Sequence, residues 1–182
     1  MNPGLTVGAG RGPYYVTNAA QLPDGNVNAT GLPGVPIKVS GHMYGGEDTS
    51  TPLPGAKIEI WHADASGSYH PNAGGDASDF RADELALRGY VLASGSGYYE
   101  FTSIYPGKYP GRCRHIHVRA SEIGFRGGVS ITTQLIVPAK EGDDQTPETD
   151  SVARALPPAN HLSFIDIDGV QEATFDFHLG HD

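Results

Sequence analysis

Hydrophobic and polar residues alternate along short runs of this chain, and a period of two residues is typical of β-strands that bury one face. Segments rich in glycine and proline, such as residues 52–55 and 95–97, separate these runs and supply turns. The pattern predicts eight strands, at residues 37–44, 56–61, 87–92, 98–103, 115–120, 130–137, 163–168 and 173–178. We therefore expect an all-β fold, an antiparallel β-sandwich of about eight strands with long loops, with an open barrel as the alternative.

Few segments carry the pattern of a helix. Residues 79–87 are compatible with a short helical turn. Residues 147–156 are a better candidate, because Thr146 could cap the start and Pro147 suits the first helical position. The sequence therefore predicts one short helix between the strands at 130–137 and 163–168.

Two segments of the chain lack the alternating pattern of strands. Residues 1–35 are rich in glycine, proline and asparagine and lack periodicity, so we expect an irregular N-terminal arm. The arm would drape over the sandwich or over a neighbouring subunit, which would allow a homo-oligomer. Residues 141–150 are acidic and polar and are expected to form a solvated loop. No repeat or boundary interrupts the chain, so residues 1–182 are expected to form a single domain.

Composition excludes several functional classes. The 182 residues are 38% hydrophobic, which is sufficient for one core and argues against disorder. The net charge of −9, with no basic stripe, argues against nucleic acid as a partner and against docking on anionic membranes. Cys113 is the single cysteine and the N-terminus lacks leader features, so a cytoplasmic location is expected. A secreted form with a trimmed signal peptide stays open.

Candidate chemistry is concentrated between residues 97 and 119. His115 and His117 are two apart on a predicted strand, so their imidazoles share one face and could bind one metal ion. Alone, such a pair is more often two satisfied or exposed histidines. Tyr109 lies six residues before His115, within reach of the strand start. A phenolate needs a strong Lewis acid such as Fe(III) near neutral pH, and the alternative for Tyr109 is an aromatic anchor for a turn.

Three segments resemble the signatures of the intradiol ring-cleavage dioxygenase family. Residues 55–70 are similar to its Gly-Ala-x-x-x-x-Trp-x-Ala-Asn/Asp-x-x-Gly-x-Tyr segment. Residues 87–117 are similar to its second signature, which here ends in Gly-Arg-x-x-His-Ile-His. Residues 12–15, Gly-Pro-Tyr-Tyr, resemble its N-terminal Gly-Pro-Phe/Tyr-Tyr element. The resemblance spans residues 10–137 and is greatest to the short, single-domain branch of the family.

The resemblance implies one non-haem Fe(3+) ion per chain. It implies four ligands: Tyr69, Tyr109, His115 and His117. Tyr69 matches the tyrosine that stays bound, whereas Tyr109 matches the one that leaves when substrate binds and can then accept a substrate proton. Asp64 either supports the Tyr69 loop by hydrogen bonds or caps a turn.

The resemblance also implies a small catechol-type substrate, cleaved with O2 to a cis,cis-muconate-type product. Arg112 matches an arginine that binds the ionised substrate and stabilises its developing charge. Gln134 falls where the family carries an active-site glutamine. Pro13 and Tyr14 of the arm are candidates for substrate binding, and the alternative for Tyr14 is packing of the arm onto the sandwich. No obvious basic cluster for a substrate carboxylate is present, although four arginines could supply one: Arg81, Arg88, Arg114 and Arg126.

Two other functions fit parts of the sequence. His62 and Asp64, completed by a distant histidine such as His161 or His178, could form the facial triad of an Fe(II) oxygenase. A transthyretin-like β-sandwich would share the Gly-Ala-x-Ile-x-Ile strand and the Gly-x-Tyr-x-Phe hairpin, and would be a binding module without catalysis.

Overall fold

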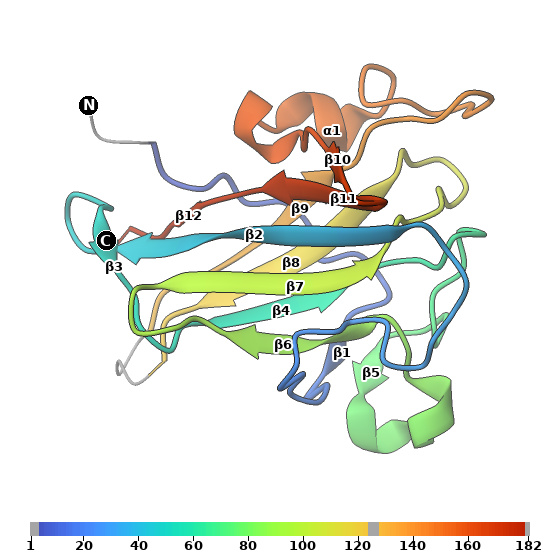
Figure 1. The fold of residues 1–182 in the computed structure, drawn as a ribbon. Coiled ribbons are helices and arrows are strands. Elements are labelled where there is room, and N and C mark those ends of the chain that lie inside the picture. Colours follow the sequence, from blue (N-terminus) through green and yellow to red (C-terminus); the bar gives the residue numbers. More distant parts are fainter. Residues whose placement is uncertain (1–3, 124–127, 181–182) are drawn as a thin grey trace.

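The alternating pattern of strand β2 (Pro36–Gly45) places every second residue in the core. Ile37, Val39 and Met43 are fully buried, whereas Lys38 and Ser40 between them are partly exposed. The computed structural model describes residues 4–123 and 128–180, and two main sheets stack face to face within them (Figure 1).

The first sheet is built around β2, and the second is antiparallel throughout. Around β2 lie β7 (Tyr98–Ile104), β11 (Val170–Thr174), β12 (Phe177–His178), β10 (Ile165–Ile167) and β3 (Thr51–Pro52). The second sheet has the order β6 (Arg88–Leu92), β4 (Lys57–Trp61), β8 (His115–Ser121) and β9 (Ser130–Ile136). A separate two-stranded ribbon consists of β1 (Val16–Thr17) and β5 (Gly75–Asp76).

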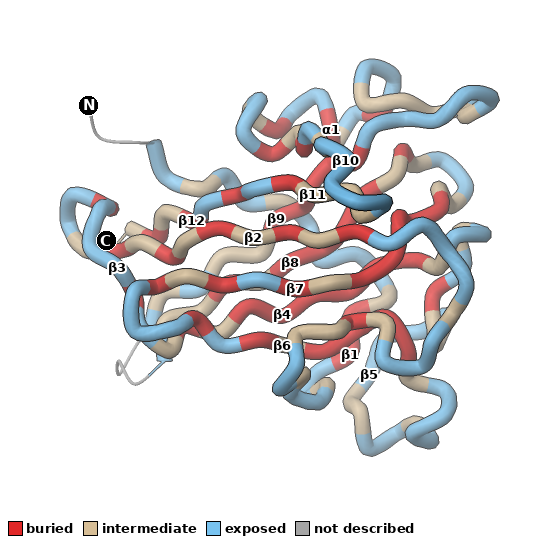
Figure 2. The backbone as a smooth tube through the Cα atoms, viewed as in Figure 1, coloured by how far each residue is buried: buried red, intermediate tan, exposed pale blue. Residues whose placement is uncertain are grey.

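The core lies between the two main sheets, and buried positions alternate most clearly along β2 and β7 (Figure 2). Its fully buried members include Ile37, Val39, Ile58, Phe101, Ile116, Val118 and Leu135. Burying one such side chain contributes roughly 1.5–3 kcal/mol. The prediction of an all-β sandwich is therefore confirmed, and the open barrel is excluded for the described residues.

Each predicted strand segment contains an observed strand, but the sandwich is mixed rather than strictly antiparallel. β11 and β12 run parallel to β2. Residues 173–178 are also not one strand, because β11 ends at Thr174 and β12 begins at Phe177. Between them the Asp176 carboxylate accepts a hydrogen bond from the His42 amide at 2.7 Å. A side-chain carboxylate thus takes the place of a backbone carbonyl at this break.

The helix between β9 and β10 is shorter than predicted, and its N-cap is different. α1 covers Ser151–Ala155, and the carboxylate of Asp150 accepts hydrogen bonds from the Val152 and Ala153 amides. Thr146 instead begins a preceding turn, in which its carbonyl accepts from the amide of Asp150. Short 3-10 turns cover η1 (Ala77–Asp79), η2 (Ala82–Glu84) and η3 (Pro158–Asn160). No helix of the described residues is long and apolar enough to cross a membrane.

The N-terminal arm lies along its own chain. It passes behind the second sheet in Figure 1, where the amide of Ala9 donates to the carbonyl of Thr132 on β9. Further on, the amide of Leu22 donates to the carbonyl of Tyr90 on β6. The arm therefore covers the outer face of the second sheet from β9 to β6. A homo-oligomer formed through this arm stays a prediction.

Candidate metal and substrate site

Four strands of the second sheet place one residue each at the same level. Arg88 on β6 is opposite Trp61 on β4, Trp61 is opposite His117 on β8, and His117 is opposite Gln134 on β9. Ile116 and Val118 face the core between the sheets. Because neighbouring residues of a strand point to opposite faces, this row lies on the outer face, beneath the arm.

His115 and His117 converge as their spacing predicts. Their Nε2 atoms are 3.1 Å apart. The Nδ1 atom of His115 donates to the carbonyl of Cys113 at 2.7 Å, which leaves its Nε2 lone pair available. The ring of His117 stacks on Trp61, with ring centroids 5.0 Å apart. Burial lowers the pKa of His115 to about 4 and the pKa of His117 well below its usual value. Both imidazoles are therefore neutral at pH 7, the form that binds metals.

Two tyrosines from separate loops complete this group. The Tyr69 hydroxyl lies 3.5 Å from Nε2 of His115. The Tyr109 ring meets the Tyr69 ring edge-on at 5.9 Å and lies 6.0 Å from the His115 ring. Burial raises the pKa of Tyr69, so without a nearby cation this phenol stays protonated. The structure brings all four predicted ligands together, while their role in metal binding stays a prediction.

Asp64 organises both tyrosine loops. Its carboxylate accepts hydrogen bonds from the amides of Ser66 at 2.8 Å and Ser68 at 3.0 Å, and lies 2.8 Å from Nε2 of His70. Its carbonyl accepts from the amide of Gly107 at 2.7 Å, in the loop that carries Tyr109. Asp64 thus both caps a turn and supports the Tyr69 loop.

Arg112 and Gln134 touch each other beside these residues. Nη2 of Arg112 donates to Oε1 of Gln134 at 2.6 Å, and Nε2 of Gln134 donates to the carbonyl of Gly10 in the arm at 2.9 Å. The Gln134 carboxamide therefore connects the arginine to the arm. Nε of Arg112 donates to the carboxylate of Asp150 at 2.7 Å.

The prediction that residues 141–150 form a solvated loop is wrong at two positions. Asp150 is buried and binds Arg112, and the largely buried Asp143 carboxylate binds Arg114 through two hydrogen bonds of 2.7 Å. A buried guanidinium requires such a partner, because desolvating a lone charge is costly. The acidic run resembled a surface loop because its arginine partners lie 38 and 29 residues upstream. Of the site residues, Asp150 was missed, although an aspartate just before a helix is a common cap signal.

The arm supplies one wall of a pocket of roughly 450 Å³. The pocket is lined by Tyr14, Gly67, Ser68, Tyr69, Asn72, Tyr109 and Pro110. The Tyr14 ring stacks on the Tyr69 ring at 4.5 Å. Arg88 donates to the carbonyls of Tyr14 and His70, at 2.7 Å each, and so ties the arm to the Tyr69 loop. Pro13 is not among the lining residues, and its part in substrate binding stays a prediction.

The arginines considered for a substrate carboxylate are used elsewhere. Arg88 binds backbone carbonyls, Arg114 binds Asp143, and the exposed Arg81 binds Asp83. Arg126 lies outside the described residues. Among the residues that line the pocket, none carries a positive charge. The described lining of this pocket is therefore uncharged.

The alternative Fe(II) triad is not formed. Both ring nitrogens of His62 are engaged, with the Ala63 carbonyl and the Ser103 hydroxyl at 2.7 Å each, and Asp64 pairs with His70. The rings of the two distant histidines, His161 and His178, contact backbone carbonyls elsewhere. Within residues 4–123 and 128–180, no three His, Cys, Asp or Glu side chains lie close enough to share a metal.

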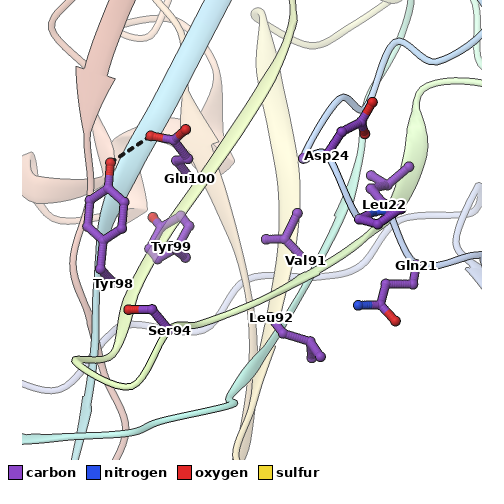
Figure 3. Close-up of a pocket in the computed structure, with 11 residues that line it drawn as sticks. Gln21, Leu22, Asp24, Val91, Leu92, Ser94, Tyr98, Tyr99 and Glu100 are labelled. Carbon is purple, nitrogen blue, oxygen red and sulfur yellow. Dashed lines mark hydrogen bonds between the residues drawn. The ribbon is translucent and has the colours of Figure 1, made fainter.

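A second hollow, of roughly 360 Å³, lies between the arm and the β6–β7 hairpin (Figure 3). Leu22 and Asp24 of the arm face Leu92 and Tyr98 across it, and the Tyr98 hydroxyl donates to Glu100 at 2.7 Å. It contains none of the predicted site residues, so the candidate site is the pocket at Tyr69.

His62 makes the stability of the fold depend on pH. Burial lowers its pKa to about 4, against 6.5 in the unfolded chain. Between these values the unfolded state binds more protons, so the stabilisation is present above pH 6.5 and is lost as the pH falls toward 4. Between pH 7 and pH 4 the unfolding free energy of the wild type falls, and we expect this fall to be about 3 kcal/mol smaller in His62→Gln. Urea denaturation at both pH values measures this. From pH 7 to 8.5 the unfolding free energies of wild type and variant should differ by a constant amount. If both proteins lose the same unfolding free energy between pH 7 and pH 4, the buried neutral state of His62 is not the cause.

Comparisons with known proteins identify the family of the chain. A family model described as "Dioxygenase" matches residues 11–179. Hydroxyquinol 1,2-dioxygenase of Nocardioides simplex is 31% identical over 151 residues, covering 73% of this chain and 46% of that protein. Chlorocatechol 1,2-dioxygenase of Rhodococcus opacus is 30% identical over 171 residues, covering 82% and 61%. The solved dioxygenase domain of a carbohydrate-binding fusion protein from Streptomyces sp. SirexAA-E has a TM-score of 0.75 at 30% identity, covering 98% and 99%. The chain thus spans about half the length of the curated relatives it matches.

Proposed function

The chain belongs to the intradiol ring-cleavage dioxygenase family, and from this premise we propose that it binds one non-haem Fe(3+) ion and cleaves a catechol-type ring with O2. The product would be of the cis,cis-muconate type. The observation that carries the proposal is the convergence of four side chains from three parts of the chain: Tyr69, Tyr109, His115 and His117.

These residues fit a ferric ion. The His115 tautomer leaves a buried lone pair that faces His117 and the Tyr69 hydroxyl, and a bound cation would satisfy all three groups. Two neutral imidazoles and two phenolates are a hard, anionic donor set suited to Fe(III). Because burial keeps the pKa of Tyr69 high, a strong Lewis acid is needed to ionise it. When bound, the ion would supply a Lewis-acid centre for the two hydroxyl oxygens of a catechol, which makes the ring reactive toward O2.

The other side chains have separate tasks in this proposal. Tyr109 would be one of the residues that hold the ion, and its oxygen would take up one substrate proton. The Arg112 guanidinium stabilises negative charge on the ring, since it lies close enough to Tyr69 and His115 to affect the pKa of each. The Tyr14 ring forms a flat wall for the substrate. Gln134 orients Arg112 and the arm through its two hydrogen bonds.

The pocket favours catechols without a carboxylate. Its described lining is aromatic and neutral, with Ser68 and Asn72 as hydrogen-bonding groups. A hydroxyl or a halogen on the ring could be accommodated there without an unpaired buried charge. Hydroxyquinol and chlorocatechol, which appear in the names of two relatives, carry a substituent of this kind.

Oxygen uptake across a panel of catechols, with product spectra, tests the proposal. We expect stoichiometric uptake with catechol, hydroxyquinol or a chlorocatechol, a muconate-type ultraviolet spectrum, and a slower reaction with protocatechuate. Iron analysis of the purified protein should give about one ion per chain. A colourless protein that takes up no oxygen after loading with iron would refute the proposal and would favour a binding module.

A further inference from the structure

Asp150 divides its two carboxylate oxygens between two tasks. Oδ1 accepts from the amides of Val152 at 2.8 Å and Ala153 at 3.2 Å, and so caps α1. Oδ2 accepts from Nε of Arg112 at 2.7 Å and from the amide of Cys113 at 2.9 Å. The residue is only 2% exposed. A buried carboxylate with four donors is held in one orientation.

The Arg112 guanidinium is consequently fixed on two of its nitrogens. Asp150 holds Nε and Gln134 holds Nη2, which defines the plane of the group. Nη1 has no hydrogen-bond partner among the described residues. A planar guanidinium held on two edges is preorganised, so its charge needs little rearrangement when substrate charge develops.

A second path leads from Asp150 to His115. The amide of Cys113 donates to Asp150, and the carbonyl of the same residue accepts from Nδ1 of His115. The Cys113 side chain is fully buried against Ala153 of α1 and Ile136 of β9. The helix, the carboxylate and the start of β8 therefore form one packed unit. Burial alone would raise the pKa of Asp150, but the donors from Cys113, Arg112 and Ala153 lower it to about 2, so the carboxylate is ionised at pH 7.

We propose that Asp150 is a positioning residue that holds Arg112, through Nε, in the orientation required to stabilise substrate charge. This inference rests on the proposed function. It assigns the helix after β9 a role in the reaction, because α1 carries the carboxylate at its N-terminus and packs on Cys113, just before the strand that carries both histidines.

Asp150→Asn separates the two tasks of the carboxylate. The retained oxygen can still cap α1, since asparagine is a good N-cap. The new amide group, however, would face two donors, Nε of Arg112 and the Cys113 amide. We expect kcat to fall about 10- to 100-fold, as for other outer partners of a site, with little change in KM. Asp150→Ser keeps a capping oxygen and removes the contact to Arg112, so its kcat should fall as in Asp150→Asn.

Asp143→Asn is the matched control. Asp143 makes the same kind of carboxylate–guanidinium pair, in the same loop, but with Arg114. The structure places neither Asp143 nor Arg114 at the pocket, so this variant should lose thermal stability and keep kcat. In an Arg112→Ala background, adding Asp150→Asn should lower kcat no further, whereas independent effects would multiply.

A substrate analogue gives a readout that does not require turnover. The absorption of bound 4-nitrocatechol reports its ionisation, and Asp150→Asn should shift it in the same direction as Arg112→Ala. If the wild-type protein cleaves no catechol, the proposed function fails. If the wild type is active and Asp150→Asn matches it in kcat and analogue spectrum, the role of Asp150 is refuted. Loss of fold and iron in both Asp150 variants would equally refute it, because Asp150 would then be purely structural.

Discussion

Tyr69→Phe is expected to abolish ring cleavage and to remove most of the visible colour of the iron-loaded protein. Loss of the hydroxyl removes a donor oxygen that lies 3.5 Å from His115 Nε2, while the buried ring keeps its packing on Tyr14. The fall in kcat should exceed the 10- to 100-fold cost of losing an outer partner. Visible absorption measures the phenolate-to-iron charge transfer, and oxygen uptake measures turnover.

Tyr109→Phe should damage a different step. Tyr109 is proposed to leave on substrate binding, so its loss should spare part of the charge-transfer band and most of the bound iron. Turnover should still fall, because one base for the substrate protons is lost. The two variants together therefore separate a fixed ligand from a mobile one.

Tyr15→Phe is the control for both variants. Tyr15 lies in the same aromatic cluster, but its hydroxyl donates to Glu59 at 2.8 Å rather than to the predicted ligands. Its removal should cost about 1 kcal/mol of stability and leave colour and turnover intact. If Tyr69→Phe keeps the colour and turnover of Tyr15→Phe, the ligand assignment of Tyr69 is wrong.

The sequence predicted those parts of the molecule that depend on local pattern. Period-two runs located the strands of both sheets, and the two-residue spacing placed His115 and His117 on one face. β11 pairs in parallel with β2, although the two strands are far apart in the sequence. The alternation of hydrophobic and polar residues carries no information on that pairing. The position of Tyr69 came from the family resemblance, because 46 residues separate it from His115.

Asp150 shows why the supporting residues were harder to find. Asp150 lies in an acidic, polar stretch that has the composition of a surface loop. Only the fold brings it to Arg112, which is 38 positions earlier. Arg88 similarly resembled a free cation, whereas the structure uses it to bind the backbone of the arm and of the Tyr69 loop. Charges that are neutralised by distant partners cannot be distinguished from solvated charges by sequence pattern alone.

Gly67→Ala is expected to separate the loops of Tyr69 and Tyr109, with a large loss of stability. Gly67 has φ of +94°, in the left-handed region, where a side chain costs roughly 1–2 kcal/mol. An added Cβ would lie 2.0 Å from the carbonyl oxygen of Lys108, a backbone atom that cannot rotate away. Gly107 makes the reciprocal approach, because a Cβ there would lie 2.3 Å from the amide nitrogen of Gly67.

The two tyrosines can reach one ion only if these loops stay in contact, so Gly67→Ala should reduce both stability and iron binding. Strain and overpacking together should cost about 2–5 kcal/mol. Urea denaturation and iron content after chelation and reloading measure the two effects. Gly95→Ala is the control, since its Cβ would meet nothing within 4 Å, and it should change stability by less than about 0.5 kcal/mol. If Gly67→Ala matched Gly95→Ala in both measurements, the close approach of the two loops would not be what holds Tyr69 and Tyr109 together.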